Sequence, residues 1–371
     1  MPRWAAALMV CAAAVFAQTD AAEEILKRAI ALHQQGKIEA AIEAYRSYIA
    51  KRPDSVLALA NLGAAYARAG RYQDAIQQYQ HALKLQPGYA GAQLNLGLAY
   101  YKTGQVEAAA SEFEKVHRAA PAELQPVLLL ADCRLAMGEN KKVIELLDPL
   151  ATGRPDDLAI AYMLGTALIR DEQPARGQTV IDRILRHGDS AETWLLLGTA
   201  KLNAGDFPGA LADLKKAVDL KPDLPDAWAY YGQALLRTGD PAAATEAYRK
   251  ALAANPYSFA ANMQMAILLK EAGDMPGARE CLVRARQVRP KDLGLRYQLA
   301  SVAMHEGNLD AARRGLEEIV KESPSYTEAH VTLATVYYRL KRKEDGDRER
   351  AIVQKLIAEA QRKQQQGLNV K

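Results

Sequence analysis

Eight prolines recur along the chain with a period of 34 residues, and this period constrains the fold more than any other feature. They are Pro53, Pro87, Pro121, Pro155, Pro222, Pro256, Pro290 and Pro324. Every step is 34 residues except one of 67, which is 33 plus 34. Such self-similarity indicates an array of small units, each of which buries its apolar face against its neighbours.

Three further columns of residues follow the same period. The first contains only Gly or Ala: Ala29, Gly63, Gly97, Ala131, Gly165, Gly198, Gly232, Ala266, Ala300 and Ala334. The second contains Gly36, Gly70, Gly104, Gly138, Glu172, Gly205, Gly239, Gly273, Gly307 and Lys341. The third contains Ala41, Ala75, Ala109, Val143, Gly177, Ala210, Ala244, Ala278 and Ala312. Because glycine inside a helix costs roughly 1 kcal/mol relative to alanine, the first column predicts a close approach of two helices.

The columns divide each unit into two helices joined by a turn. The small residue and the turn glycine are separated by about two helical turns, with large apolar residues on the neighbouring face. Capping side chains begin several of the second helices: Asp206, Asp240, Asp274 and Asn308. Pro241 suits the first helical position, and the periodic proline ends each unit because it cannot continue a helix. Each unit is therefore predicted to be a helix–turn–helix hairpin.

The unit at residues 57–87 resembles a tetratricopeptide repeat in Leu62, Gly63, Tyr66, Gly70, Ala75, Tyr79, Ala82 and Pro87. Trp194 and Trp228 occupy the family's tryptophan column. Over the whole chain the residues that carry the resemblance are Gly63, Tyr66, Ala75, Tyr79, Pro87, Gly97, Tyr100, Ala109, Phe113, Pro121, Gly165, Gly198, Ala210, Gly232, Tyr248 and Pro256. The resemblance implies an all-α fold: a right-handed superhelical solenoid of about nine such units with a C-terminal capping helix.

This register predicts three segments: a signal peptide at 1–17, the repeat array at 18–342, and a charged capping helix and tail at 343–371. The predicted repeats are 22–55, 56–89, 90–123, 124–157, 158–190, 191–224, 225–258, 259–292, 293–326 and a partial one at 327–342. Repeats four and five depart from the pattern at Ala131, Val143, Leu147, Glu172, Gly177 and Asp189. They mark a bend, a weak joint, a binding specialisation or tolerated drift.

The first seventeen residues have the pattern of a secretory signal peptide. Arg3 precedes an apolar run from Trp4 to Phe16, and Ala17 offers a small residue for cleavage. An uncleaved anchor is the alternative. No later stretch is long and apolar enough to span a bilayer, so we expect an exported chain, periplasmic or extracellular. Cys133 and Cys281 lie four units apart, and we expect two buried, unbridged residues.

Composition and motifs argue against several classes of function. The net charge of +4 is too small to indicate a nucleic-acid partner, although residues 339–371 contain ten Lys/Arg and five Asp/Glu. The six histidines fall at different repeat positions, and no HExxH, paired CxxC or phosphate-binding glycine loop occurs. We therefore predict no catalytic, cofactor-binding or metal-binding residues, and a chain that is not an enzyme.

The resemblance further implies that the first helices line a concave groove that binds a protein or peptide partner. The predicted groove residues are Asn61, Asn95, Tyr101, Tyr162, Thr166, Tyr230, Gln233, Met263, Gln264, Tyr297 and Gln298. Chaperone-binding members of the family clamp a peptide carboxylate with basic side chains. With the small residue of the first column counted as position eight of each repeat, positions five and nine carry no Lys or Arg here, so that clamp is expected to be absent. An extended segment with apolar anchors, or a partner helix, fits the residues better.

Three functions remain open at this point. The favoured one is a non-catalytic interaction scaffold that binds a partner segment along its groove. The second is a structural subunit of a cell-envelope or secretion assembly, joined through its edges and its basic tail. The third is a binder of glycan or another non-protein ligand, which only the tyrosines suggest. The oligomeric state and the identity of the partner are not predicted.

Overall fold

The computed structural model describes residues 21–185 and 190–368, and every regular element in these ranges is an α-helix. The all-α prediction is therefore confirmed, whereas the predicted signal peptide lies outside the described residues. The chain divides into two compact units, Met1–Ala167 and Leu168–Lys371. Within its described residues the first unit contains a helix at 21–34, followed by α2 (Ile38–Lys51), α3 (Val56–Arg68), α4 (Tyr72–Leu85), α5 (Ala90–Lys102), α6 (Val106–Ala119), α7 (Leu124–Ala136), α8 (Asn140–Gly153) and most of α9 (Leu158–Arg170).

The second unit continues with the helices that the C-terminal repeats predict. They are α10 (Pro174–Leu185), α11 (Ala191–Ala204), α12 (Phe207–Leu220), α13 (Ala227–Arg237), α14 (Pro241–Ala254), α15 (Phe259–Glu271), α16 (Met275–Val288), α17 (Leu293–His305), α18 (Leu309–Glu322), α19 (Thr327–Arg339) and α20 (Lys343–Leu368).

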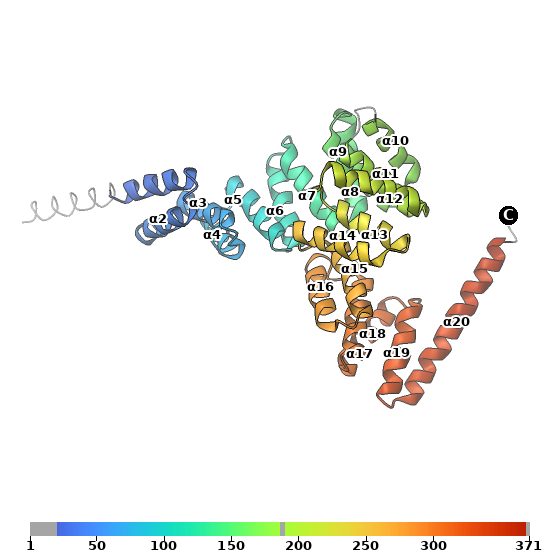
Figure 1. The fold of residues 1–371 in the computed structure, drawn as a ribbon. Coiled ribbons are helices and arrows are strands. Elements are labelled where there is room, and N and C mark those ends of the chain that lie inside the picture. Colours follow the sequence, from blue (N-terminus) through green and yellow to red (C-terminus); the bar gives the residue numbers. More distant parts are fainter. Residues whose placement is uncertain (1–20, 186–189, 369–371) are drawn as a thin grey trace, which may run out of the picture. The chain divides into compact units, whose positions relative to one another are not determined.

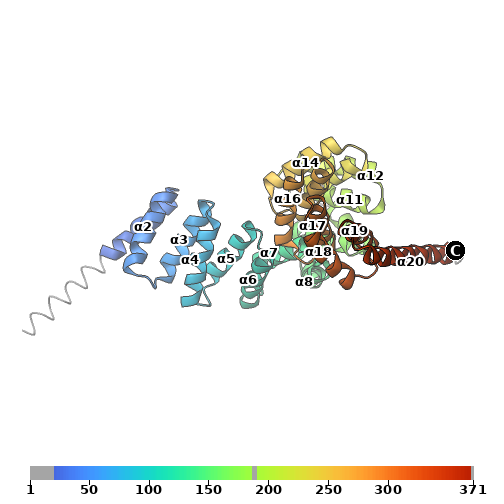
Figure 2. The ribbon, with the colours of Figure 1, turned by 90° about the horizontal axis from the view of Figure 1, so that it is seen from below.

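In both units consecutive helices pair as hairpins, such as α3 with α4 and α15 with α16 (Figure 1). Figure 2 shows the same pairing in a perpendicular view. The second helix of one hairpin also packs on the first helix of the next, as α4 does on α5 and α12 on α13. Each hairpin therefore buries its apolar residues against its neighbours in the chain, which is the packing of a solenoid.

The column of small residues marks the place where the two helices of a hairpin approach most closely. A Cβ atom built on Gly97 would lie 2.6 Å from Cε1 of Phe113, and one on Gly232 would lie 2.8 Å from Cε1 of Tyr248. Both aromatic rings are fully buried. Glycine is required here because its missing side chain leaves room for the ring, and burial of that ring offsets the loss of helix propensity.

The second column marks the turn that ends each first helix. Its eight glycines have positive φ angles between 74° and 91°, the left-handed conformation that glycine adopts without strain. Glu172 and Lys341 replace glycine in this column, and both retain the left-handed backbone, with φ of 56° and 61°. The array therefore enforces the turn geometry even where the residue disfavours it.

The second helices of the C-terminal hairpins have side-chain caps that those of the first three hairpins lack. Asp206, Asp240, Asp274 and Asn308 each accept a hydrogen bond from a backbone amide of the first helical turn, as predicted. The residues at the same place in the first three hairpins make no side-chain cap: Lys37, Arg71 and Gln105. Carboxylate and amide oxygens satisfy otherwise unbonded amides, so the second helices of the later hairpins have better-defined starts.

The irregular fourth repeat keeps the hairpin in spite of its altered residues. Val143 and Leu147, which stand in place of the usual Ala and aromatic residue, are both fully buried on α8. Gly138 retains the positive φ of the turn. The larger residue in the third column and the smaller one four residues later fill the same core, so the departures at these two positions preserve the hairpin.

The C-terminal helix α20 packs against α19 and then continues beyond it (Figure 1). His330 of α19 is buried, and its Nδ1 lies 2.5 Å from a carboxylate oxygen of Glu349 on α20. Its Nε2 lies 3.0 Å from the carbonyl oxygen of Pro324. Farther along α20, Ile352 and Ile357 remain exposed. The start of α20 thus covers the last repeat, while its later part leaves apolar side chains in solvent.

Candidate partner-binding surface

First helices of several neighbouring hairpins contact one another. Contacts join α11 to α13, α13 to α15, α15 to α17 and α17 to α19 in the second unit, and α3 to α5 in the first. We call the part formed by α13, α15, α17 and α19 the first-helix surface. It is the place where the sequence predicts partner contact in this unit.

The predicted partner-binding residues fall in both units. Asn61, Asn95, Tyr101, Tyr162 and Thr166 lie in the first unit, and Tyr230, Gln233, Met263, Gln264, Tyr297 and Gln298 lie in the second. All are partly exposed except Gln233, which is exposed, and Thr166, which is buried. The hydroxyl of Thr166 donates to the carbonyl oxygen of Tyr162 in its own helix, at 2.8 Å. Thr166 therefore offers a partner little surface, whereas the other residues retain accessible atoms.

A lysine that the sequence reasoning missed joins two of the surface helices. Lys270, near the end of α15, donates from Nζ to the amide oxygen of Gln298 on α17, at 2.7 Å. The same nitrogen lies 3.4 Å from the hydroxyl of Ser301. Burial lowers the pKa of Lys270, and Glu271 opposes that shift. Lys270 occupies repeat position twelve, which the resemblance places on the groove. The search for basic residues covered positions five and nine only, and extending it to position twelve would have found this lysine.

Aromatic residues form a second contact farther along the surface. The hydroxyl of Tyr297 on α17 lies 3.1 Å from the hydroxyl of Thr332 on α19. Its ring lies 5.5 Å from the ring of Tyr326, measured between centroids. These contacts hold Tyr297 in place while part of the side chain remains exposed, so it is an ordered apolar anchor for a partner.

Arg170 at the end of α9 reaches the start of α13. It donates from Nε to the hydroxyl of Tyr230 at 2.9 Å, and its Nη2 lies 3.5 Å from a carboxylate oxygen of Asp226. Asp226 has a left-handed backbone with φ of 62°, although it is not a glycine. The predicted site residue Tyr230 therefore already has a hydrogen-bond partner in the chain. This bond joins the fifth hairpin, which begins with α9, to the seventh, which begins with α13.

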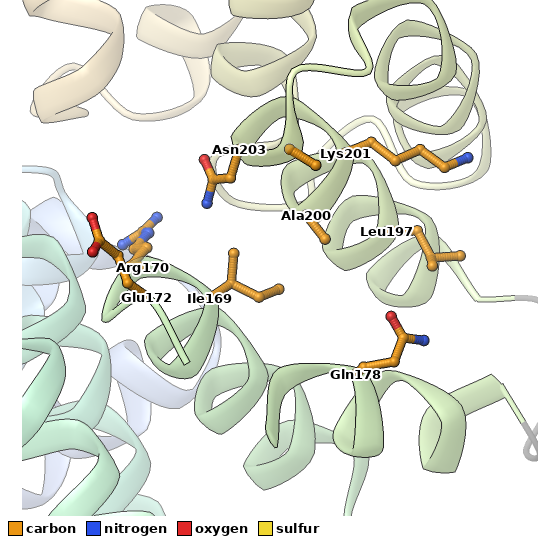
Figure 3. Close-up of a pocket in the computed structure, with 9 residues that line it drawn as sticks. Ile169, Arg170, Glu172, Gln178, Leu197, Ala200, Lys201 and Asn203 are labelled. Atoms are coloured by element: carbon orange, nitrogen blue, oxygen red, sulfur yellow. The ribbon is translucent and has the colours of Figure 1, made fainter. Parts of the chain in front are cut away.

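A pocket of about 940 Å³ opens between the fifth hairpin and α11. Figure 3 shows Ile169 and Gln178 on one side of it and Leu197 and Ala200 on the other. Gln178 is exposed, whereas the aliphatic residues at the same repeat position in earlier hairpins, Ile42, Ile76 and Ile144, are buried. The pocket therefore lies beside a position at which three earlier hairpins bury an isoleucine.

Two of the charged groups that line this pocket, Lys201 and Arg170, have partners within the chain. Lys201 lies with its Nζ 2.6 Å from a carboxylate oxygen of the buried Asp213, and Arg170 makes the contacts described above. The pocket thus offers mainly a small apolar lining to any ligand. One of its lining residues, Glu172, is a position at which repeat five departs from the pattern of the other repeats.

The acidic residues, histidines and cysteines bear on metal binding and on thiol reactivity. In residues 21–185 and 190–368 no cluster of three or more His, Cys, Asp and Glu side chains has a geometry for a metal ion. Cys133 and Cys281 are free and buried, as predicted, and burial raises the pKa of each thiol. A thiol with a raised pKa is a poor nucleophile at neutral pH.

Comparison with known proteins decides the family. Two profiles described as tetratricopeptide repeat match the chain, one at residues 26–90, 65–123, 162–225, 195–259 and 297–346, and the other at 235–301. The chain belongs to the tetratricopeptide repeat family. The matches omit residues 124–161, which include the irregular fourth repeat. The structure nevertheless shows a hairpin of α7 and α8 there, so this tetratricopeptide repeat has diverged in sequence and kept its fold.

A solved structure agrees with the fold of this tetratricopeptide repeat protein. A chain in the crystal structure of the APC/C hetero-tetramer Cut9–Hcn1 matches with a TM-score of 0.52 and 13% identity. The match covers 90% of this chain and 87% of the other. No curated protein matches the chain. At this identity the likeness establishes the fold alone. The family match adds that tetratricopeptide repeats are in general non-catalytic scaffolds for protein interaction.

Proposed function

We propose that this protein is a non-catalytic scaffold that binds an extended segment of a protein partner along the first-helix surface. The observation that carries the proposal is a row of exposed and partly exposed amide and aromatic side chains on the neighbouring first helices α13, α15 and α17: Tyr230, Gln233, Gln264, Tyr297 and Gln298. Amides bond a peptide backbone without regard to its side chains, and ordered tyrosines supply apolar contact.

Site-specific photo-cross-linking tests the surface directly. A photoreactive amino acid replaces Gln233 or Gln264 on the first-helix surface, and Gln287 on the outer helix α16 serves as the control. We expect the two surface positions to capture the same partner segment, and position 287 to capture none. Capture at position 287 alone would place the partner on the second helices and contradict the proposal.

A second candidate function rests on the end of α20. Ile352 and Ile357 are exposed on a helix that extends beyond its last packing partner. This favours a structural subunit that joins an envelope or secretion assembly through its C-terminal helix. Removing residues 351–371 distinguishes the two functions: loss of assembly with unchanged cross-linking at position 264 supports this second one.

We also propose that the chain is exported, because residues 1–17 contain an apolar run followed by a small residue suited to cleavage. Within the described residues no helix combines the length and apolar character needed to cross a bilayer. Cell fractionation with N-terminal sequencing of the mature protein tests this. A new N-terminus at residue 18 supports cleavage, an intact N-terminus in the membrane fraction supports the anchor, and an intact N-terminus in the cytoplasm contradicts export.

A further inference from the structure

The pocket beside α11 lies at one joint of the array, where a joint is the contact between one hairpin and the next (Figure 3). Its described lining residues fall between positions 169 and 204, within the second unit. None of them is a predicted groove residue, and α11 is not part of the first-helix surface. The volume of about 940 Å³ is in the range of pockets that hold small-molecule ligands.

Equivalent leucines in other repeats show how little covers α11 at this joint. Leu197 occupies position seven of its repeat, lines the pocket and is partly exposed, as is its equivalent Leu299. Five other leucines at position seven are buried: Leu62, Leu96, Leu130, Leu164 and Leu333. The same residue type at the same place is thus left open to solvent on the pocket side of α11.

Polar side chains replace apolar ones at two positions of this joint. Gln178 stands where three earlier hairpins have isoleucine, and its amide nitrogen donates to Asp182 in its own helix, at 2.7 Å. Lys201 occupies position eleven, and its Nζ lies 2.6 Å from a carboxylate oxygen of Asp213 in its own hairpin. In five other repeats position eleven is apolar and buried: Tyr66, Leu168, Leu235, Ala303 and Tyr337. At both positions the joint lacks a side chain that fills other joints.

The lining that remains is mainly apolar. Leu197, Ala200 and Ala204 are three, four and seven residues apart on α11, so they share one face of the helix. Ile169 lies on the other side of the pocket (Figure 3). Water in an apolar recess has few hydrogen-bond partners, so an apolar ligand gains free energy by displacing it.

The polar groups of the lining favour an uncharged ligand. The cationic groups of Lys201 and Arg170 already bond within the chain, so neither requires an anion. A cation would meet only the exposed carboxylate of Glu172, and exposed ion pairs contribute little. The exposed amides of Gln178 and Asn203 are neutral groups, and amides bond hydroxyl and carbonyl groups well.

We propose that the pocket between the fifth hairpin and α11 binds a small, uncharged and mainly apolar molecule, with a polar group bonded to the amide of Gln178 or Asn203. This ligand site is separate from the surface proposed for the partner segment and does not depend on it. Because the ligand binds only the folded joint, it stabilises the second unit.

A matched pair of fluorescent probes tests the site on the full-length protein. Phenylnaphthylamine is neutral, and anilinonaphthalene sulfonate has the same aromatic rings with one added sulfonate. Both are titrated into wild type and into Gln178→Ile and Ala200→Leu, which add apolar side chains to the pocket. The control, Gln287→Ile, makes the same change on the outer helix α16. Circular dichroism and the thermal midpoint establish that each variant is folded.

We expect phenylnaphthylamine to bind wild type at one saturable site, more tightly than the sulfonate probe, and to raise the thermal midpoint. Gln178→Ile and Ala200→Leu should each weaken its binding roughly ten-fold or more, because the added carbon atoms occupy the space of the ligand. Gln178→Ile should also raise the thermal midpoint without ligand, because it fills the joint from within. Gln287→Ile should bind the probe as wild type does.

Three results would overturn the proposal. If wild type binds no phenylnaphthylamine while Gln178→Ile is stabilised, the joint is only loosely packed and is not a ligand site. Equal binding of the neutral probe by wild type and the folded Gln178→Ile variant places the probe elsewhere on the protein. Tighter binding of the sulfonate probe than of the neutral one contradicts an uncharged ligand.

Discussion

At the scale of single residues, Gly97 shows how a helix gains from a residue with poor helix propensity. Replacing it with Leu should lower the free energy of unfolding by about 1–3 kcal/mol, because the new side chain enters the space of the buried Phe113 ring. Chemical denaturation measures the change. The control is Gly91→Leu in the same helix, where a Cβ meets no atom within 4 Å. Equal stability of both variants would contradict the predicted helix contact.

Replacement of Lys341 is expected to stabilise the protein, whereas replacement of Gly97 destabilises it. Its left-handed backbone is strained for any residue with a Cβ atom, so Lys341→Gly should stabilise the last hairpin by up to about 1 kcal/mol. Lys341→Ala removes the same side chain and keeps the strain, so it should show no gain. The thermal midpoints of the two variants give the comparison, and a larger gain in the Ala variant would show that the side chain, rather than the backbone, is responsible.

These residues were predictable because the period compares each position with its equivalents in other repeats. Gly97 conforms to the column of small residues, whereas Lys341 departs from the column of turn glycines. In both columns the backbone geometry is the same from one repeat to the next. The contact of Lys270 with Gln298 has no such repetition: it depends on one side chain crossing between two helices. The contact of Arg170 with Tyr230 joins residues 60 positions apart and depends on how three hairpins pack.

At the scale of elements, the helix caps divide the hairpins into two groups. Asp240→Ala should cost about 1 kcal/mol, because the amide of Ala243 loses the acceptor that lies 2.9 Å away. Lys37→Ala, at the equivalent position of α2, should cost little because Lys37 makes no cap. Hydrogen exchange in the first turns of α14 and α2 measures both effects. Similar loss of protection in the two helices would show that the carboxylate is not the stabilising group.

Sequence reasoning located these helix caps and the capping helix that ends the array, but not the contact that fixes that helix. Asp240 and Asn308 are recognisable because the residue types that cap helices are few. The contact of His330 with Glu349 fixes α20 on α19. His330 lies in the tryptophan column, but Glu349 lies beyond the repeats and has no equivalent position for comparison. The pocket beside α11 also escaped prediction in its details. Gln178 is polar where three earlier hairpins have isoleucine, but only the packed hairpins show that a pocket opens beside it.

At the scale of the whole molecule, contacts between neighbouring hairpins predict local rather than all-or-none unfolding. In such an array, stability is close to a sum of hairpin and interface contributions. Gly232→Leu should therefore reduce hydrogen-exchange protection in α13 and α14, where Tyr248 must move, and leave α3–α6 unchanged. Gly97→Leu should show the reverse pattern. Uniform loss of protection along the chain in either variant would indicate a single cooperative unit.

The close contact of Gly97 with Phe113 has a consequence for how such a chain lengthens. Both residues belong to one hairpin, so the tightest packing in the repeat needs nothing from outside it. A duplication of one 34-residue segment would carry its own core, its own turn and its own terminating proline to the new location. Only the interface with the next hairpin would need to adjust. Insertion or exchange of whole repeats is thus the mutational path that this packing favours, in genes and in protein engineering alike.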